Sequence, residues 1–129
     1  MYAHIIELAL PIDQAIEQLK AALAEAKMGV ISEVDVQAIM KAKINHDIPP
    51  YRLLGICAPG IAKAVIEADP DAGALLPCGC CVYETTPGNT RIALQAPASI
   101  AQLANNSAIT AAMDVGQTHL AGVIARLKA

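Results

Sequence analysis

The alternation between short apolar runs and stripes with helical spacing constrains the fold most strongly. Residues 5–10 fit a first strand, which Pro11 ends. Apolar residues then recur at i, i+3, i+4 and i+7, the spacing of one buried helix face, and Pro11 is acceptable in the first turn of such a helix. Gly29 is a suitable stop. The stripe comprises Ile12, Ala15, Ile16, Leu19, Ala22, Leu23 and Ala26.

The middle of the chain continues the alternation. Residues 29–34 predict a second strand, and Asp35 is a suitable N-cap for a short helix. Residues 51–57 predict a third strand, whose apolar character favours an interior position. Pro59 opens a helix that ends at the Asp-Pro pair 69–70, because the residue before a proline disfavours helix. The short helix is expected to bury Val36, Ile39 and Met40.

A hairpin and a long helix complete the pattern. Residues 75–84 and 91–94 predict two strands joined by a turn at 86–89. The segment 105–107 offers caps for the last helix. The order β-α-β-α-β-α-β-β-α predicts an α+β fold, a two-layer α/β sandwich with a mixed sheet of about five strands, in a single domain over residues 1–129. The last helix is expected to bury Met113, Leu120, Val123, Ile124 and Leu127.

Composition narrows the function classes. The chain is 55% hydrophobic and has no Phe or Trp, so its core must be aliphatic. A net charge of −3 without a Lys/Arg cluster argues against nucleic-acid binding. No apolar run is long enough for a membrane span, and the first residues lack a secretory signal, so we expect a cytoplasmic protein. Cytoplasmic cysteines are normally reduced, which favours thiols or metal ligands over disulfides.

Four cysteines are the candidate site residues. Cys78, Cys80 and Cys81 fall within four positions, and Cys57 lies where the third strand meets the Pro59 helix. Exposed N–H groups and the dipole at a helix start favour a thiolate at Cys57. The alternative for Cys57 is a small buried hydrophobic residue, whose burial would raise the pKa of its thiol.

The spacing of the other three thiols favours metal or thiol chemistry over a disulfide. Alternation puts Cys78 and Cys80 on one face of a strand and Cys81 on the other. Residues two apart on a strand are separated by roughly 6.5 to 7 Å at Cα, at the upper limit for a disulfide. If the third and fourth strands are neighbours, Cys57 can join them in a site for Cu(I) or Zn(II). Thiol exchange or persulfide carriage, and plain filling of the core, remain alternatives.

Other polar residues give weaker signals. His4, His46 and His119 are isolated, and His119 is expected to be a partly buried packing residue. Met113 and His119 are six positions apart, so one helix cannot offer both to a haem, although a haem shared across a dimer stays open. Asp35 is explained as a cap, so Glu33 and Asp35 are not assigned acid–base work. If buried, Arg52 needs an ionic partner, and Glu84 is the candidate.

Several segments together resemble a family, the domain-of-unknown-function family 302. They are residues 29–36, 49–57, 67–71, 75–78 and 82–84, in the family's order. The resemblance implies a compact α/β fold that is commonly dimeric, with cysteine often found at the positions of Cys57 and Cys78, and no established activity. Ala58 departs from the usual Asn, and Cys80 and Cys81 replace plain aliphatic residues.

Two functional hypotheses follow. In the first, Cys57, Cys78, Cys80 and Cys81 bind a soft metal ion or carry out thiol or persulfide redox chemistry. In the second, the chain is a non-catalytic, dimeric small-ligand-binding or interaction module whose cysteines are structural. Neither hypothesis requires a nucleic acid, a membrane or a partner other than a second copy of the chain.

Overall fold

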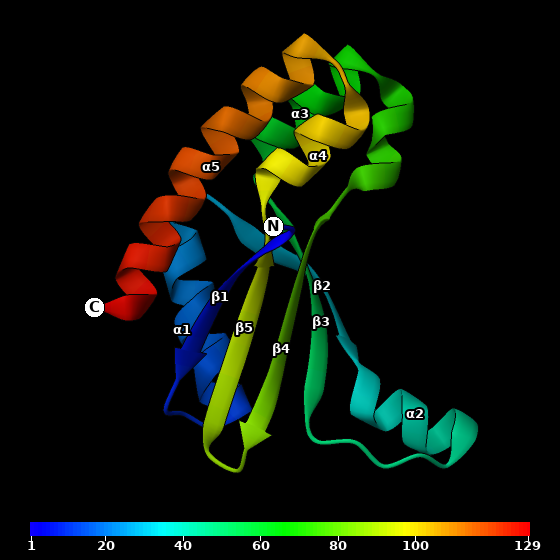
Figure 1. Cartoon of the computed structure of the whole chain (residues 1–129), viewed down its shortest axis with the longest axis vertical. Coiled ribbons are helices and arrows are strands. Elements are labelled where there is room, and N and C mark those ends of the chain that lie inside the picture. The colour runs from blue at the N-terminus through cyan, green and yellow to red at the C-terminus, as the bar shows by residue number, and fades with distance from the viewer.

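Five strands form one sheet in the order β1-β5-β4-β3-β2 in the computed structural model, which describes residues 1–129 (Figure 1). The predicted number of strands and the predicted α+β class are confirmed. In the β4–β5 turn Gly88 has a φ of 83°, a conformation that glycine adopts without strain. The strands are β1 (Ala3–Leu8), β2 (Gly29–Asp35), β3 (Tyr51–Cys57), β4 (Cys78–Thr86) and β5 (Asn89–Gln95).

Every neighbouring pair in this sheet is antiparallel, so the expectation of a mixed sheet is corrected. The reason lies in the connections. The connection through α1 (Ile12–Glu25) joins β1 to β2, but these two strands lie at opposite edges of the sheet and do not pair. The other connections each return the chain to the end of the sheet at which it left. They contain α2 (Val36–Ile44), α3 (Pro59–Ala68) with the 3-10 helix η1 (Pro70–Leu75), and the β4–β5 turn.

The main hydrophobic core lies between one face of the sheet and two helices. The α1 stripe is buried from Ile12 to Leu23, as its spacing predicts, and packs beside the second half of α5 (Ser107–Lys128). All the large side chains of this core are aliphatic. It comprises Ile6, Ile12, Ile16, Leu19, Ala22, Leu23, Leu54, Ile56, Cys80, Val82, Ile92, Leu94, Leu120, Val123 and Leu127.

Two polar side chains from the β4–β5 hairpin fix the start of α1. Proline precedes this helix and provides no side-chain cap. Instead the backbone N–H of Ile12 donates to Glu84 Oε2 at 2.9 Å, and the buried Thr90 hydroxyl donates to the Leu10 carbonyl at 2.7 Å. An otherwise unpaired helix N–H is thereby satisfied by a carboxylate, which the helix dipole also favours.

A second, smaller core lies beyond the end of the sheet where β3 ends and β4 begins. There α3 and α4 (Pro97–Ala104) pack against the first half of α5, and η1 packs against α3 (Figure 1). Asn106 caps α5, as expected, because its side chain accepts from the N–H groups of Ala108 and Ile109. This second core comprises Val65, Ala72, Ile100, Ile109, Ala112 and Met113.

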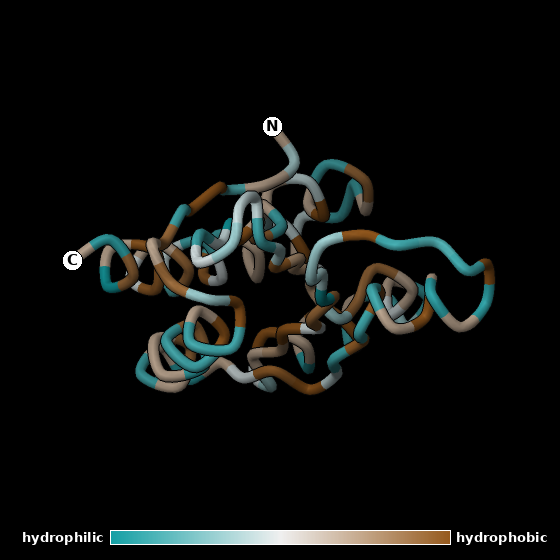
Figure 2. Tube along the Cα trace, turned by 90° about the horizontal axis from the view of Figure 1, so that it is seen from below, coloured by the Kyte–Doolittle hydropathy of each residue, from teal (hydrophilic) through white to brown (hydrophobic).

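The short helix α2 differs from its prediction in what it buries. Asp35 caps it, accepting from the N–H of Ala38 at 3.0 Å. The helix has no buried residue, however, and Ile39 is 47% exposed. It projects beyond the edge strand β2, away from both cores, as the view from below also shows (Figure 2). Among all the helices, none combines the length and hydropathy needed to span a bilayer.

Candidate functional site

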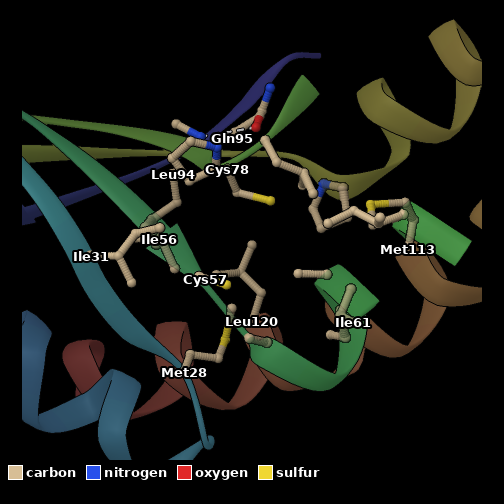
Figure 3. Close-up of a pocket in the computed structure, with 18 residues that line it drawn as sticks. Met28, Ile31, Ile56, Cys57, Ile61, Cys78, Leu94, Gln95, Met113 and Leu120 are labelled. Atoms are coloured by element: carbon tan, nitrogen blue, oxygen red, sulfur yellow. Dashed lines mark hydrogen bonds between the residues drawn. The ribbon is translucent and has the colours of Figure 1, made fainter. Parts of the chain in front are cut away.

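An apolar pocket lies at the junction of the two hydrophobic cores. It has a volume of about 300 Å³ and is lined by 18 residues, 13 of them hydrophobic. Ile56, Leu94 and Leu120 reach it from the main core, and Met113 reaches it from the smaller one (Figure 3). Its other lining residues are Met28, Ile31, Cys57, Ala58, Ile61, Ala62, Ile66, Leu76, Pro77, Cys78, Gly79, Gln95, Pro97 and Gly116.

Chain turns and small residues keep this volume open. β3 ends at Cys57 and α3 starts two residues later with Pro59 in its first turn. Gly116 lies in the middle of α5, and a Cβ there would lie 3.5 Å from the Ile61 side chain and 4.0 Å from that of Pro97. These are ordinary contact distances, so α5 packs closely against Ile61 and Pro97 at this point. Because Gly116 has no side chain, it leaves the adjoining pocket unfilled.

Cys57 and Cys78 both line this pocket, from adjacent strands. Ile56 is the register partner of Cys78, so Cys57 follows directly after the residue that faces Cys78. The third and fourth strands are neighbours, as expected. Through this pairing Cys57 shares the pocket with Cys78. Both residues are half-buried. A solute in the pocket can therefore contact both thiols.

Cys80 and Cys81 lie elsewhere, so the four cysteines do not come together at this pocket. Cys80 is 5% exposed in the main core, where it faces Leu54 and Leu94 across the sheet. Cys81 faces the opposite side of the sheet, as strand alternation predicts. No group of three or more His, Cys, Asp or Glu side chains is placed to hold a metal ion. The chain thus brings two of its four thiols to the pocket and separates the other two from it.

Comparisons with known proteins identify the family of this chain and a solved structure with the same fold. The family model for the domain of unknown function DUF302 matches residues 4–127, almost the whole chain. The chain belongs to the DUF302 family. A crystal structure of an uncharacterized conserved DUF302 protein from Bacillus stearothermophilus superposes with a TM-score of 0.87 at 24% identity, covering 98% of each chain. This level of identity supports the shared fold only. The comparison with curated sequences gave no match.

Burial sets the protonation of two thiols in this DUF302 domain. Removal from water, and to a smaller extent the neighbouring Cys57, raises the pKa of Cys78 above its usual value. Burial and then Cys81 raise the pKa of Cys80 to about 12. Both thiols are therefore protonated at neutral pH. A protonated thiol is a poor nucleophile, so Cys78 is suited to binding or to metal-assisted deprotonation rather than to spontaneous attack.

The histidines lie outside the pocket. His46 is exposed in the loop after α2, and His4 Nε2 lies 3.3 Å from Gln117 Oε1. His119, on α5, is half-buried as expected, although its Nδ1 is buried without a hydrogen-bond partner. Because no histidine lines the pocket, the residues around it do not fit an axial imidazole ligand for a haem.

Arg52 has other partners than the one expected. Its guanidinium faces Asp13, Glu33 and Asp35 at 3.4 to 3.8 Å, while Glu84 is used at the start of α1. The expected pairing failed because Glu84 lies nearer to the β1–α1 turn, whose backbone N–H needs an acceptor. The carboxylates of Glu33 and Asp35 belong to this ionic group, and Asp35 is also the predicted cap.

Sequence reasoning missed the aliphatic and thioether residues that make the pocket. Met28, Ile61, Met113 and Gly116 belong to three different segments, with the last two on α5, and only the packing of these segments brings them together. Gly116 gave the one available signal. A glycine inside a long helix is unfavourable by roughly 1 kcal/mol relative to alanine, which indicates a packing or functional reason for it.

Proposed function

We propose that this protein binds a small, neutral, largely apolar molecule in the pocket between its two cores, against the thiols of Cys57 and Cys78. The observation that carries the proposal is the pocket itself. Its volume of about 300 Å³ lies at the lower end of the range of small-molecule sites, and its wall is mostly aliphatic carbon and sulfur.

The polar groups near the pocket favour an uncharged ligand. Gln95 is the one lining residue with a polar amide side chain, and its Oε1 already accepts from the N–H of Gly79 at 3.0 Å. Its amide nitrogen points away from the cavity in Figure 3. No Lys, Arg, Asp, Glu or His lines the wall, so a charged ligand would lose its hydration without gaining a partner.

A matched pair of glycine substitutions in α5 tests this function. Gly116 lies in the pocket wall, whereas a Cβ at Gly122 on the same helix meets nothing within 4 Å. Gly116→Leu places a branched side chain in the pocket, and Gly122→Leu gives the same gain in helix propensity on the surface. The assay is fluorescence titration with 1-aminoanthracene, a small neutral apolar fluorophore, followed by displacement with 1-octanol.

We expect saturable binding of one probe molecule per chain, weakened at least about tenfold in Gly116→Leu and unchanged in Gly122→Leu. Circular dichroism of each variant verifies that the helices remain folded. Ala62→Leu, from α3 on the other side of the pocket, provides a second obstruction. Equal probe affinity in the wild type and in both obstructed variants contradicts the proposal, as does the absence of saturable binding.

We also propose that the chain forms a homodimer, as the family resemblance implies. The sheet face opposite the helices carries a cross-strand row formed by Ile5, Ala93, Cys81, Leu53 and Val34. Ile5 and Leu53 are 42% and 46% exposed. An exposed apolar row of this kind favours an interface. Light scattering after gel filtration tests it, with a wild-type dimer and a Leu53→Asp monomer as the expected result and a monomeric wild type as the contradicting one.

A further inference from the structure

The pocket between the two cores has an exposed side and a buried side. Ile31 on the edge strand β2 and Ile66 on α3 both line it and are 64% and 46% exposed. The wall residues from α5 are all buried, and Met113 among them is 2% exposed. Figure 3 draws Ile31 and Met113 on opposite sides of the cavity, with Leu120 between them. The pocket therefore opens on the side of β2 and α3 and is closed by α5.

A β-bulge places Ile31 at this open side. Val30 pairs with Ile56 and Ser32 pairs with Gly55, so Ile31 between them has no partner on β3. Bulges re-aim a side chain and are frequent next to functional sites. Here the extra residue brings an isoleucine to the pocket wall while leaving most of it in water. Exposed apolar surface of this kind, beside an apolar cavity, is typical of the entrance to a ligand site.

We infer that the pocket takes a single-chain amphiphile, whose apolar chain lies inside and whose polar head stays in water beside Ile31. This ligand class rests on the proposed function, because the pocket must first admit an apolar solute. The one lining amide, that of Gln95, already accepts from Gly79, and no charged side chain lines the wall. A polar group inside would therefore lose its hydration without gaining a partner, whereas a head at the open side keeps its hydration.

The volume of the pocket limits the length of the chain. A water molecule occupies about 30 Å³ in the liquid, so a pocket of about 300 Å³ holds about ten groups of that size. A methylene group has a similar size, and the pocket therefore fits a chain of about eight to ten carbon atoms. Each buried methylene should raise the affinity about three- to fourfold until the chain fills the pocket.

Displacement of 1-aminoanthracene by two homologous series tests the position of the head group. The series are n-alkanols and n-alkanoates of about six to fourteen carbon atoms, each below its critical micelle concentration, at about pH 8, where the alkanoates are ionised. We expect the affinity to rise with chain length and to level off at about ten carbon atoms in both series. Octanoate should bind within about fivefold of octanol, because its carboxylate stays in water.

A pair of lysine substitutions tests whether the head lies beside Ile31. Ile31→Lys places a cation at the open side, which should raise the octanoate affinity about fivefold and leave the octanol affinity unchanged. The matched control is Ile39→Lys on α2, at a residue that is 47% exposed and lies outside the pocket. Both substituted side chains are largely exposed, so both variants should fold, and circular dichroism verifies this.

The outcomes separate this inference from the proposed function. If octanol displaces the fluorophore but octanoate binds more than about tenfold more weakly, the head lies inside the wall, and only the amphiphile is overturned. An unchanged ratio of octanoate to octanol affinity in Ile31→Lys, or an equal gain in Ile39→Lys, also overturns the amphiphile alone. The absence of saturable fluorophore binding overturns both proposals.

Discussion

The glycine pair next to the end of the β3–β4 ladder gives the sharpest prediction of the structure. Gly55 and Gly79 face each other across the two strands. A Cβ at Gly55 would lie 2.2 Å from Ser32 Oγ and 2.6 Å from Pro77 Cγ, whereas one at Gly79 meets nothing within 4 Å. The same substitution in one cross-strand pair should therefore have opposite effects on stability.

The expected change in unfolding free energy of each variant follows from two opposing effects. Replacing glycine by alanine lowers the entropy of the unfolded chain and stabilises by about 0.4–1 kcal/mol where the conformation is compatible. Gly79→Ala should show this gain. At Gly55 the added methyl group must displace a rigid proline ring, and such overpacking costs about 1–3 kcal/mol. Gly55→Ala should therefore lose about 1–2 kcal/mol of unfolding free energy.

Urea unfolding followed by far-UV circular dichroism measures the unfolding free energy of both variants, and we expect their m values to be equal. Adding Ser32→Ala removes the shorter of the two contacts, so the double variant with Gly55→Ala should recover about 0.5–1 kcal/mol. The ring of Pro77 would still obstruct, so recovery should be partial. If Gly55→Ala and Gly79→Ala agree within about 0.3 kcal/mol, the close approach of Pro77 to β3 is refuted.

Three further predictions concern other contacts. Glu84→Ala should cost about 1–2 kcal/mol in urea unfolding, because it leaves the Ile12 N–H without its acceptor, and an unchanged midpoint would contradict that contact. Cys80→Val should change stability by less than about 1.5 kcal/mol, whereas Cys80→Asn should cost more than about 2 kcal/mol by burying an unpaired amide; equal effects would contradict its place in the core. A hydrogen bond with Cys81, followed by burial, raises the pKa of Tyr51 from 10.0 to about 12. The folded state then retains a proton that the unfolded state releases, so unfolding free energy should fall between pH 10 and 12, and the fall should be smaller in Tyr51→Phe.

Local sequence patterns predicted the elements well because most elements carry their own signal. The stripe from Ile12 to Leu23, the cap at Asp35 and the cap at Asn106 all depend on residues within a few positions of one another. The antiparallel order of the sheet was not predictable in this way. It depends on β1 and β2 lying at opposite edges, and no pattern within either strand specifies its neighbour.

The candidate site was predictable only in part, for a related reason. Strand alternation placed Cys81 apart from Cys80, and neighbouring strands brought Cys57 to Cys78. Alternation could not tell that Cys80 enters the closed core while Cys78, two residues earlier on the same face, enters an open pocket. That difference depends on where α1 and α5 cover the sheet, which is a property of tertiary packing.

The pocket is an expensive feature for a domain with an aliphatic core, and this weighs in favour of a function for it. Removing packed volume costs about 24 cal/mol per Å³ of cavity, so a sealed void of about 300 Å³ would cost about 7 kcal/mol, comparable with the whole stability of many domains. An open pocket costs less, since water can enter it, yet its wall still forgoes packing contacts. One leucine in place of Gly116 would recover part of that loss and improve the helix as well. A chain that needed only to fold gains nothing from glycine there, so the empty volume is best explained by an occupant.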